Sequence, residues 1–392
     1  MNKRTFAKSL LLCATLGWAG LTTAQEAFKV GLILPMTGPF ASTGRQIESA
    51  ARLYMAQHSD TVAGRKVQLI LKDDGGSADT TRRLAQELVV NDKVDVLAGF
   101  GLTPLALAVA PIATRAQTPA VVMAAATATI TEASPFIVRS GFTLPQVTEP
   151  MAQWAANNAI KKVVTLVSDY GPGIDAETAF KGRFGAAGGE VLDSLRVPLA
   201  NPDFAPFLQR VRDLSPDAVF VFVPSGVGSA FMKQFASRGL ADAGIRLIAT
   251  GDVTDDDLLN GMGDAAVGVV TTHHYSAAHD SAANRQYVEA FRKAYNARPN
   301  FHSVGGYDGM HLIYQALAET GGKGGGKALV DAMKGKSWES PRGPMTIDPE
   351  TRDVIQNVYV RKVESKDGEL YNVEFDTYEA VKDPVKAAKK AS

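Results

Sequence analysis

The sequence predicts an α/β protein made of two doubly wound lobes, each with a parallel sheet. Short apolar runs that do not alternate with polar residues recur along the chain, for example Val219–Val223. Such runs are typical of parallel strands that helices cover on both faces. Stretches with apolar residues at helical spacing, such as Ile47, Ala50, Ala51 and Tyr54, lie between the runs. This alternation of strand and helix favours doubly wound sheets.

The apolar runs form two sets, which divide near residues 141–147. Two sheets of about five strands are favoured over one sheet of about ten, because open sheets twist. The expected strands are Lys29–Leu34, Val67–Lys72, Val94–Phe100, Ala120–Ala124, Phe136–Arg139, Lys162–Ser168, Glu190–Val197, Ala218–Val223, Arg246–Thr250 and Val267–His273.

Beyond Ser276 the sequence changes to mostly helical patterns with two late strands. The expected helices are Asn284–Ala297, Gly306–Thr320 and Gly326–Met333, and the late strands lie near Met345–Ile347 and Val354–Val363. The glycine-rich segment 321–326 is expected to be a surface loop between helices.

The first 24 residues have the features of a cleaved secretory signal peptide. Basic residues come first, an uncharged apolar run covers Leu10–Leu21, and small residues lead to a cut after Ala24. The apolar run is shorter than the ~20 residues that a membrane-spanning helix needs. Cys13 is the only cysteine, so the mature chain would have none. We therefore expect a periplasmic protein without disulfides.

The charge balance argues against nucleic acid as a partner. Lys plus Arg number 41 and Asp plus Glu number 41, so the formal net charge is zero. A nucleic-acid-binding domain usually carries an excess of basic residues. We therefore expect no nucleic acid among the partners of this protein.

Small and polar residues follow several strands at their carboxyl ends, which is where open α/β sheets bind ligands. Hydroxyl groups and free N–H groups at helix starts suit a carboxylate, because a helix N-terminus carries partial positive charge. Thr103 and Thr127 stand at two such starts, although either one could simply cap its helix. Two of them on neighbouring strands favour an anion site. The loops in question are 35–44, 99–104, 124–129, 168–171, 224–226 and 250–252.

Four stretches at these loops and beyond carry a family resemblance. They are Lys29–Pro39 with Gly44, Asp73–Asp74, Asp169–Gly173 and Gly343–Pro344. In their order and spacing they resemble the Leu/Ile/Val-binding protein family, the type I periplasmic binding proteins of ABC importers. The likeness runs from about Phe28 to Tyr371.

The resemblance implies two discontinuous lobes that three crossovers join and a hinge motion closes. We expect residues 25–142 with 276–343 to form lobe 1, and residues 143–275 with 344–392 to form lobe 2. The implied function is capture of a solute by lobe closure and its delivery to an ABC permease in the inner membrane. A ligand-sensing module without transport is a further alternative.

The resemblance also implies the residues of the ligand site. Thr103 looks like the hydroxyl that holds the ligand carboxylate, and Tyr170 like the second-lobe tyrosine that closes on the ligand. Asp252 falls where amino-acid binders carry an acid for the ammonium group. Together with the strand-end loops, these residues give the predicted ligand-binding set: Thr43, Phe100, Gly101, Thr103, Ala124, Ala126, Thr127, Tyr170, Pro224, Ser225 and Asp252.

Three departures from the family pattern argue against strict Leu/Ile/Val specificity. Thr43 replaces an aromatic residue, Pro224 replaces a tyrosine, and Asp252 is one methylene shorter than the family's glutamate. Some family members with a similar pattern look like binders of aromatic carboxylates. Apolar residues near the strand ends also suit an aromatic ring; these are Phe40, Phe100, Met123 and Phe222.

The expected ligand is therefore a small hydrophobic or aromatic carboxylate such as a benzoate, with a branched-chain or other hydrophobic amino acid as the alternative. Asp252 separates the two classes. An ammonium group needs a buried carboxylate partner. A benzoate would be repelled by Asp252 unless that side chain were protonated or turned away.

None of three motifs considered, a dinucleotide-binding loop, a nucleophile turn and a histidine metal site, supports an enzymatic function. The loop after the first strand lacks the G-x-G-x-x-G of a dinucleotide site. The stretch Pro224–Gly226 lacks the leading glycine of a G-x-S-x-G nucleophile turn. His273 and His274 are adjacent on a strand and point to opposite faces, which disfavours a shared metal. We expect no catalytic residue, metal ligand or cofactor.

Overall fold

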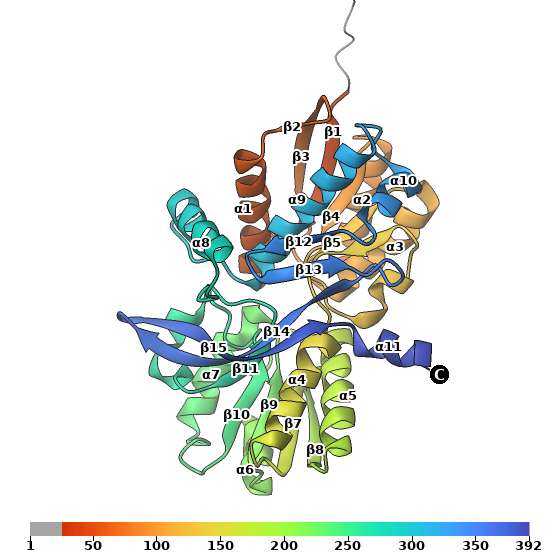
Figure 1. Ribbon diagram of the computed structural model, residues 1–392. Helices are drawn as coiled ribbons and strands as arrows, with labels where there is room; N and C mark the ends of the chain where they lie inside the picture. The colour runs from red at the N-terminus through yellow and green to blue at the C-terminus, as the bar shows by residue number, and fades with distance from the viewer. Residues whose placement is uncertain (1–25, 392) are drawn as a thin grey trace, which may run out of the picture.

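The computed structural model describes residues 26–391 and has two α/β lobes, one above the other (Figure 1). The signal peptide predicted for residues 1–24 lies outside the described residues. One sheet has six strands and the other has nine. The predicted fold class, two doubly wound α/β lobes, is confirmed.

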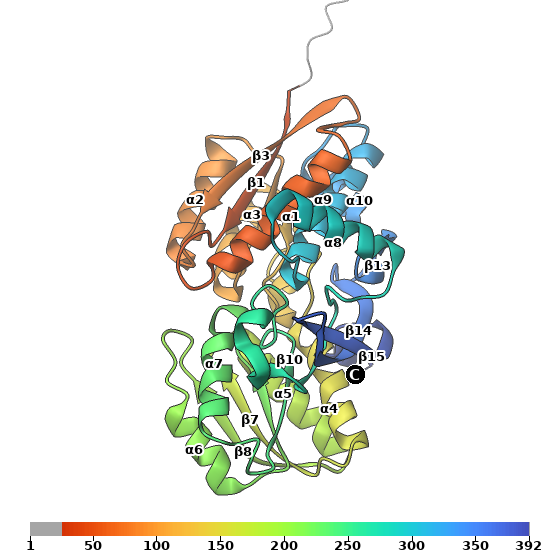
Figure 2. The same ribbon diagram turned by 90° about the vertical axis from the view of Figure 1, so that its left-hand side faces the viewer.

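Lobe 1 is built on the six-stranded sheet, whose order is β2-β3-β1-β4-β5-β6. Its strands are β1 (Phe28–Leu34), β2 (Thr61–Val62), β3 (Arg65–Asp73), β4 (Val96–Gly99), β5 (Ala120–Val122) and β6 (Ile137–Arg139). Its helices are α1 (Ala41–Gln57), α2 (Ala78–Val90), α3 (Thr103–Ala116), η1 (Ala128–Glu132), α8 (Ala282–Tyr295), α9 (Phe301–Glu319) and α10 (Gly326–Met333). Figure 2 shows α2 on one side of β1 and β3, and α1 with α9 on the other.

Lobe 2 is built on the nine-stranded sheet, whose order is β12-β13-β14-β11-β10-β9-β7-β8, with β15 paired to β14. Its strands are β7 (Lys162–Ser168), β8 (Glu190–Val197), β9 (Ala218–Phe222), β10 (Arg246–Thr250), β11 (Val270–His273), β12 (Ser337–Ser340), β13 (Gly343–Ile347), β14 (Val354–Lys366) and β15 (Glu369–Val381). Its helices are α4 (Leu144–Asn157), α5 (Gly171–Ala186), α6 (Ala205–Leu214), α7 (Ser225–Ser237), η2 (Leu259–Ala266) and α11 (Pro384–Ala391). Figure 2 shows α6 and α7 on the side of this sheet opposite to α4.

The strands β12 and β13 connect the two lobes. They are hydrogen-bonded to lobe 2 through β14. Their side chains, however, pack on lobe 1, because Met345 and Ile347 belong to the same buried cluster as β1 and α9. The nine-stranded sheet therefore reaches across the junction, as the path of β14 in Figure 1 also shows. The boundary expected between residues 343 and 344 coincides with the start of β13.

Each of the ten predicted apolar runs contains a strand, but β2, β12 and β15 were not predicted. Taken together, the two sheets are mostly parallel, as predicted, but at the end of the chain β14 pairs antiparallel with both β11 and β15. The strand β15, with the sequence ELYNVEFDTYEAV, is partly exposed and mixes polar with apolar residues. A search for continuous apolar runs detects only strands buried on both faces.

Both sheets reverse their strand order at a point that opens toward the other lobe. In lobe 1 the chain starts at β1, adds β3 on one side and then adds β4 on the other side. In lobe 2 it starts at β7, adds β8 on one side and then β9 on the other side. Ligands bind at such switch points, outside the carboxyl ends of the strands. The loops after β1, β4, β7 and β9 are therefore the places where a site is expected.

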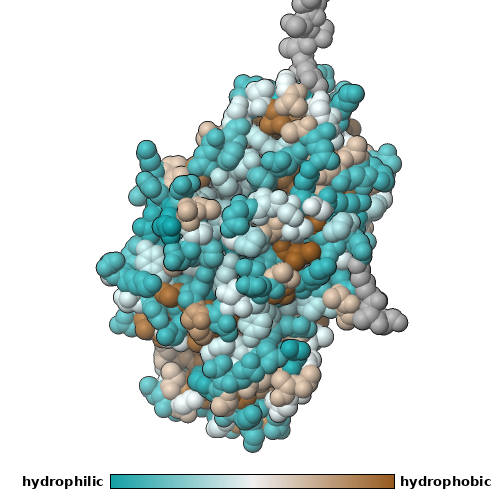
Figure 3. Space-filling model, in the orientation of Figure 1, coloured by the Kyte–Doolittle hydropathy of each residue, from teal (hydrophilic) through white to brown (hydrophobic). Residues whose placement is uncertain are grey.

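Within residues 26–391, no helix combines the length and the apolar character that crossing a bilayer demands. The face drawn in Figure 3 is mainly hydrophilic, and its hydrophobic residues lie in small separate areas.

Candidate functional site

The loops at the two switch points enclose a shared cavity between the lobes. The atom-free space among its lining residues, counted together with its openings to solvent, is about 370 Å³. The lining residues from lobe 1 and the adjoining crossover are Phe40, Thr43, Gly101, Leu102, Thr103, Ala124, Ala125, Ala126, Phe142 and His302. Those from lobe 2 are Leu144, Tyr170, Pro172, Phe222, Pro224, Ser225 and Asp252.

Three helices begin at this cavity. Thr103, Gly171 and Ser225 are the first residues of α3, α5 and α7, and Tyr170 and Pro224 are the N-caps of α5 and α7. The first N–H groups of a helix have no partner within it and carry partial positive charge. Among the described residues that line the cavity there is no lysine or arginine. An anion in the cavity would therefore be held by N–H groups and hydroxyls.

Thr103 and Thr127 form a hydroxyl pair, which we call the threonine pair. Thr103 Oγ1 donates to Thr127 Oγ1 at 3.0 Å, and both side chains are nearly fully buried. Neither side chain caps a helix, because Leu102 is the N-cap of α3 and Thr127 makes no side-chain cap bond to η1. The simple capping role considered for the two threonines is therefore wrong.

The lobes are closed against one another around the cavity. A Cβ atom placed on Gly171 would lie 2.7 Å from Thr127 Oγ1, and one placed on Gly226 would lie 2.4 Å from the carbonyl oxygen of Pro39. Real Cβ atoms essentially never come this close to another atom. A side chain at position 226 would therefore require the Pro39 backbone to shift, and one at position 171 would require Thr127 to move. The backbone N–H of Ala128 also donates across the junction to Asp175 Oδ2, at 2.9 Å.

Apolar and aromatic side chains form the walls of the cavity. The rings of Tyr170 and Phe222 are nearly parallel, with an interplanar angle of 21° and 6.1 Å between centroids. Phe40 and Phe142 supply two further rings from lobe 1 and the crossover. Burial, with a smaller contribution from the charge of Asp252, holds the pKa of the Tyr170 hydroxyl well above its usual value. The hydroxyl is therefore un-ionised at neutral pH.

Asp252 brings a carboxylate to the cavity, next to two histidines. Its Oδ2 accepts from Thr250 Oγ1 at 2.9 Å and lies 3.5 Å from His273 Nε2. Burial lowers the pKa of His273 to about 4, although Asp252 opposes that shift. Burial also lowers the pKa of His302 to about 3, and the Asp252 charge again opposes it. Both rings are therefore neutral at physiological pH. We call Asp252, His273 and His302 the acid–histidine group.

Most of the predicted site residues come together in this cavity. Thr43, Gly101, Thr103, Ala124, Ala126, Tyr170, Pro224, Ser225 and Asp252 line it. Thr127 lies behind Thr103. The ring of Phe100 is fully buried in the lobe 1 core, where the backbone turns through a φ of 66° after β4. That left-handed turn is why the residue following Gly99 packs inward while Gly101–Thr103 face the cavity.

Several lining residues were not predicted from the sequence. Leu102 and Ala125 lie within the predicted loops but do not belong to the predicted ligand-binding set. Phe142, Leu144 and Pro172 lie a few residues beyond a strand end, and His302 lies in α9, remote from any strand end. The sequence does not show that α9 packs on lobe 1, so it could not predict His302 as a site residue.

The prediction that His273 and His274 point to opposite faces was wrong, because both rings pack against Phe142. His273 and His274 pack with Phe142 and Phe301 in a buried aromatic cluster, where the two histidine rings lie 4.5 Å apart. His279 Nδ1 lies 2.8 Å from Glu374 Oε2. Over residues 26–391, no cluster of three His, Cys, Asp or Glu side chains is arranged to hold a metal ion.

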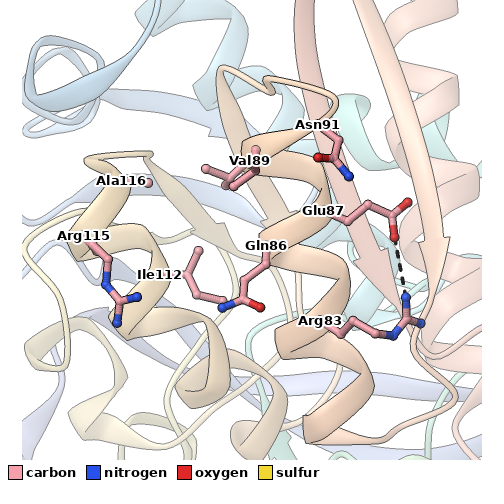
Figure 4. A pocket seen from close by; sticks show the side chains of 9 residues that line it. Arg83, Gln86, Glu87, Val89, Asn91, Ile112, Arg115 and Ala116 are labelled. Carbon is pink, nitrogen blue, oxygen red and sulfur yellow. Dashed lines mark ion pairs between the residues drawn. The ribbon is translucent and has the colours of Figure 1, made fainter.

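A larger hollow lies elsewhere on lobe 1, between α2 and α3 (Figure 4). Its atom-free space is about 1220 Å³, and its lining includes Arg83, Glu87 and Arg115. These residues come from the outer faces of two helices and from no strand-end loop. Its position away from both switch points makes it a poor candidate for the solute site.

Comparisons with known proteins agree with the fold. The family model described as periplasmic binding protein matches residues 27–369. The Leu/Ile/Val-binding protein homolog 6 of Brucella abortus is 45% identical over 381 residues, which are 96% of this chain and 98% of that protein.

Two solved structures are also similar to this chain. One is a solute-binding protein of an ABC transporter from Rhodopseudomonas palustris BisB5 in complex with 3,4-dihydroxybenzoic acid. It is 63% identical with a TM-score of 0.90, over 92% of this chain and 99% of that chain. The other is a solute-binding protein from R. palustris in complex with 4-hydroxybenzoate. It is 42% identical with a TM-score of 0.89, over 91% of this chain and 98% of that chain.

Proposed function

This chain belongs to the periplasmic binding protein family and is a solute-binding protein of an ABC transporter, and we propose that its solute is an aromatic carboxylate of the benzoate class. One observation carries the proposal: loops from both switch points converge on a single cavity with aromatic walls and no lysine or arginine among its described lining residues. The aromatic acids bound by the two similar R. palustris proteins support the same ligand class.

The ligand carboxylate binds at the threonine pair and the start of α3. A hydroxyl hydrogen rotates to suit its partner. Thr103 therefore turns its proton to the carboxylate and accepts a hydrogen bond from Thr127 in exchange. Across the junction, the start of α5 at Gly171 lies against the threonine pair. The partial positive charges of two helix N-termini thus stabilise one carboxylate.

The ring of the ligand lies among the aromatic walls. Tyr170 and Phe222 of lobe 2 meet it from one side, and Phe40 of lobe 1 from the other. Aromatic pairs gain about 0.5–1.5 kcal/mol each beyond the burial of apolar area. Because the lobe 2 residues reach the ligand only on closure, the ligand shifts the population from an open to a closed form.

The closed form then docks on the permease of the importer. We further propose that residues 1–24 direct export to the periplasm, that the mature protein acts as a monomer, and that the lobes divide as 25–142 with 276–343 and 143–275 with 344–392. Membership of the periplasmic binding protein family supports all three proposals.

A hydrophobic amino acid is the second candidate solute, and Asp252 is the observation that favours it. A buried carboxylate beside the cavity provides the partner that an ammonium group requires. The Brucella relative is likewise named as a Leu/Ile/Val-binding protein homolog.

Isothermal titration calorimetry of the mature chain with two ligand panels tests the proposal. One panel contains benzoate and its ring-hydroxylated derivatives, and the other contains leucine, isoleucine, valine and phenylalanine. We expect dissociation constants in the micromolar range or below for members of the first panel only. Binding of the amino acids alone would replace the proposed solute with the second candidate, and binding of neither panel would overturn both.

A further inference from the structure

Asp252 has no obvious role if the ligand is an anion. Its side chain is 4% exposed and lines the same cavity that the proposed function fills with a carboxylate. A buried negative charge with few partners costs several kcal/mol. Thr250, His273 and the buried guanidinium of Arg361 offset part of this charge. A hydrogen-bond donor on the ligand would offset more of it.

One oxygen of Asp252 is left for the ligand. The hydrogen bond from Thr250 and the contact with His273 are both made to Oδ2. Among the described residues, no hydrogen bond is found to Oδ1. A carboxylate oxygen accepts hydrogen bonds and donates none when it is ionised. A donor on the ligand can therefore complete it.

His302 adds a second unsatisfied polar group to the same region. It comes from α9 of lobe 1, is 7% exposed, and lines the cavity. Its Nδ1 has no hydrogen-bond partner among the described residues. Its ring packs on Phe301 with 4.1 Å between centroids, which fixes its place. As a neutral imidazole it offers one donor and one acceptor.

We propose that Asp252 and His302 recognise ring hydroxyl groups, so that this protein prefers hydroxylated benzoates over benzoate itself. The inference rests on the proposed function and specifies the substrate within it. A phenolic hydroxyl donates to Asp252 Oδ1, and a second hydroxyl on the adjacent ring carbon pairs with His302. The ligand carboxylate at the threonine pair and its hydroxyl at Asp252 then orient the ring in one direction.

This assignment also explains why Asp252 tolerates an anionic ligand. The hydroxyl is a neutral donor that places a partial positive charge against the carboxylate, and a hydrogen bond to a charged group is about twice as strong as a neutral one. Benzoate lacks this donor and leaves Asp252 Oδ1 without a partner in a closed cavity. Benzoate and the hydroxylated benzoates thus differ in whether the buried charge of Asp252 gains a hydrogen bond from the ligand.

The first test uses the unaltered mature chain and four ligands: benzoate, 4-methoxybenzoate, 4-hydroxybenzoate and 3,4-dihydroxybenzoate. The methoxy compound keeps the oxygen but has no proton to donate. We expect the two hydroxylated ligands to bind at least about tenfold more tightly than the other two, as the loss of a charged hydrogen bond implies. Equal affinity for 4-methoxybenzoate and 4-hydroxybenzoate would overturn the inference while leaving the proposed function intact.

The second test repeats the titrations with Asp252→Asn and His302→Gln, and with Asp169→Asn as the matched control. Asp169 is an exposed carboxylate two residues before α5 and outside the cavity lining. We expect Asp252→Asn to weaken the hydroxylated ligands about 5- to 30-fold and to leave benzoate unchanged or tighter. His302→Gln should weaken 3,4-dihydroxybenzoate more than 4-hydroxybenzoate, and Asp169→Asn should change neither.

The melting temperature of each ligand-free variant is measured alongside, so that a folding defect is recognised. An equal loss of affinity for all four ligands in a folded Asp252→Asn variant would make Asp252 a structural residue and refute its recognition role. Absence of binding by every ligand to the unaltered chain would overturn the proposed function and this inference with it.

Discussion

The threonine pair and the acid–histidine group are two polar regions of one cavity, and they are built in opposite ways. Thr103 and Thr127 are uncharged, belong to one lobe and hydrogen-bond to each other at 3.0 Å. Asp252, His273 and His302 come from three separate segments and include buried ring nitrogens without partners among the described residues. Two hydroxyls that hydrogen-bond to each other can bind any carboxylate. Polar atoms without a hydrogen-bond partner favour a ligand that supplies the matching donor or acceptor. We infer that the first region sets affinity and the second sets preference.

Closure brings the two regions together, so blocking it has the largest expected effect. In Gly226→Ala, the new methyl group would meet the carbonyl oxygen of Pro39 at 2.4 Å in the closed form. Overpacking of this kind costs about 1–3 kcal/mol, which corresponds to roughly 5- to 150-fold weaker binding of every ligand. Calorimetry measures the affinity, and small-angle scattering with saturating ligand measures the fraction closed.

Gly182→Ala is the control for that variant, because a Cβ there meets nothing within 4 Å. It should bind as the unaltered chain does. Unchanged affinity in Gly226→Ala would contradict the closed form as the ligand-bound state.

Removing the Thr103 hydroxyl should have an effect of similar size. Thr103→Val keeps the shape of the side chain but loses the hydrogen bond to the ligand carboxylate. The loss of a hydrogen bond to a charged group costs about 1.5–3 kcal/mol, or roughly 10- to 150-fold in affinity. Benzoate and hydroxybenzoates should lose affinity by the same factor, as measured by calorimetry. A change in preference among them would show that the two regions are not separate in function.

Thr127→Val should have a smaller effect of the same kind. Thr127 does not line the cavity but bonds to Thr103. Its removal deprives Thr103 of a partner and should weaken all carboxylates by roughly 2- to 10-fold, the range of one neutral hydrogen bond. An effect larger than that of Thr103→Val would mean that Thr127 contacts the ligand directly.

The acid–histidine group should also make stability depend on pH. Burial lowers the pKa of His302 to about 3, below the ~6.5 of an unfolded histidine. The unfolded chain therefore binds this proton more readily, and the contribution of His302 to the free energy of unfolding falls as pH drops from about 6.5 toward 3. Above about pH 7 the contribution is complete and constant.

Urea titrations at pH 4.5 and pH 7 measure this effect. In His302→Gln the difference in unfolding free energy between the two pH values should be smaller, by up to about 1.4 kcal/mol per pH unit. His58→Gln, at an exposed position just after α1, should keep the full difference. A His302→Gln variant with the unaltered pH dependence would mean that this ring is not buried as a neutral group.

The same contrast separates the site residues that the sequence predicts from those that it does not. Thr103, Thr127 and Gly101 follow strands of the sheet, so the rule that ligands bind at strand ends is enough to locate them. Asp252 was also found, at the end of β10. His302 was not, because its position depends on how α9 returns from a distant part of the chain to pack on lobe 1. Local patterns carry no information on such a contact.

The fold shows the same limit. Buried parallel strands were predicted because both faces are covered and the residues are continuously apolar. The antiparallel strand β15 and the bridging strand β12 were missed because exposed faces interrupt their apolar pattern. Phe100 was placed in the site for its position after β4, but a left-handed turn directs its ring into the core.

A crystal structure of the mature chain with 4-hydroxybenzoate tests the central claim most directly. The account predicts closed lobes, with the ligand carboxylate within about 3.2 Å of Thr103 Oγ1 and the ring hydroxyl at a similar distance from Asp252 Oδ1. A reversed ligand, with its carboxylate beside Asp252, would contradict the assignment of the two regions. A ligand bound instead in the hollow between α2 and α3 would contradict the site itself.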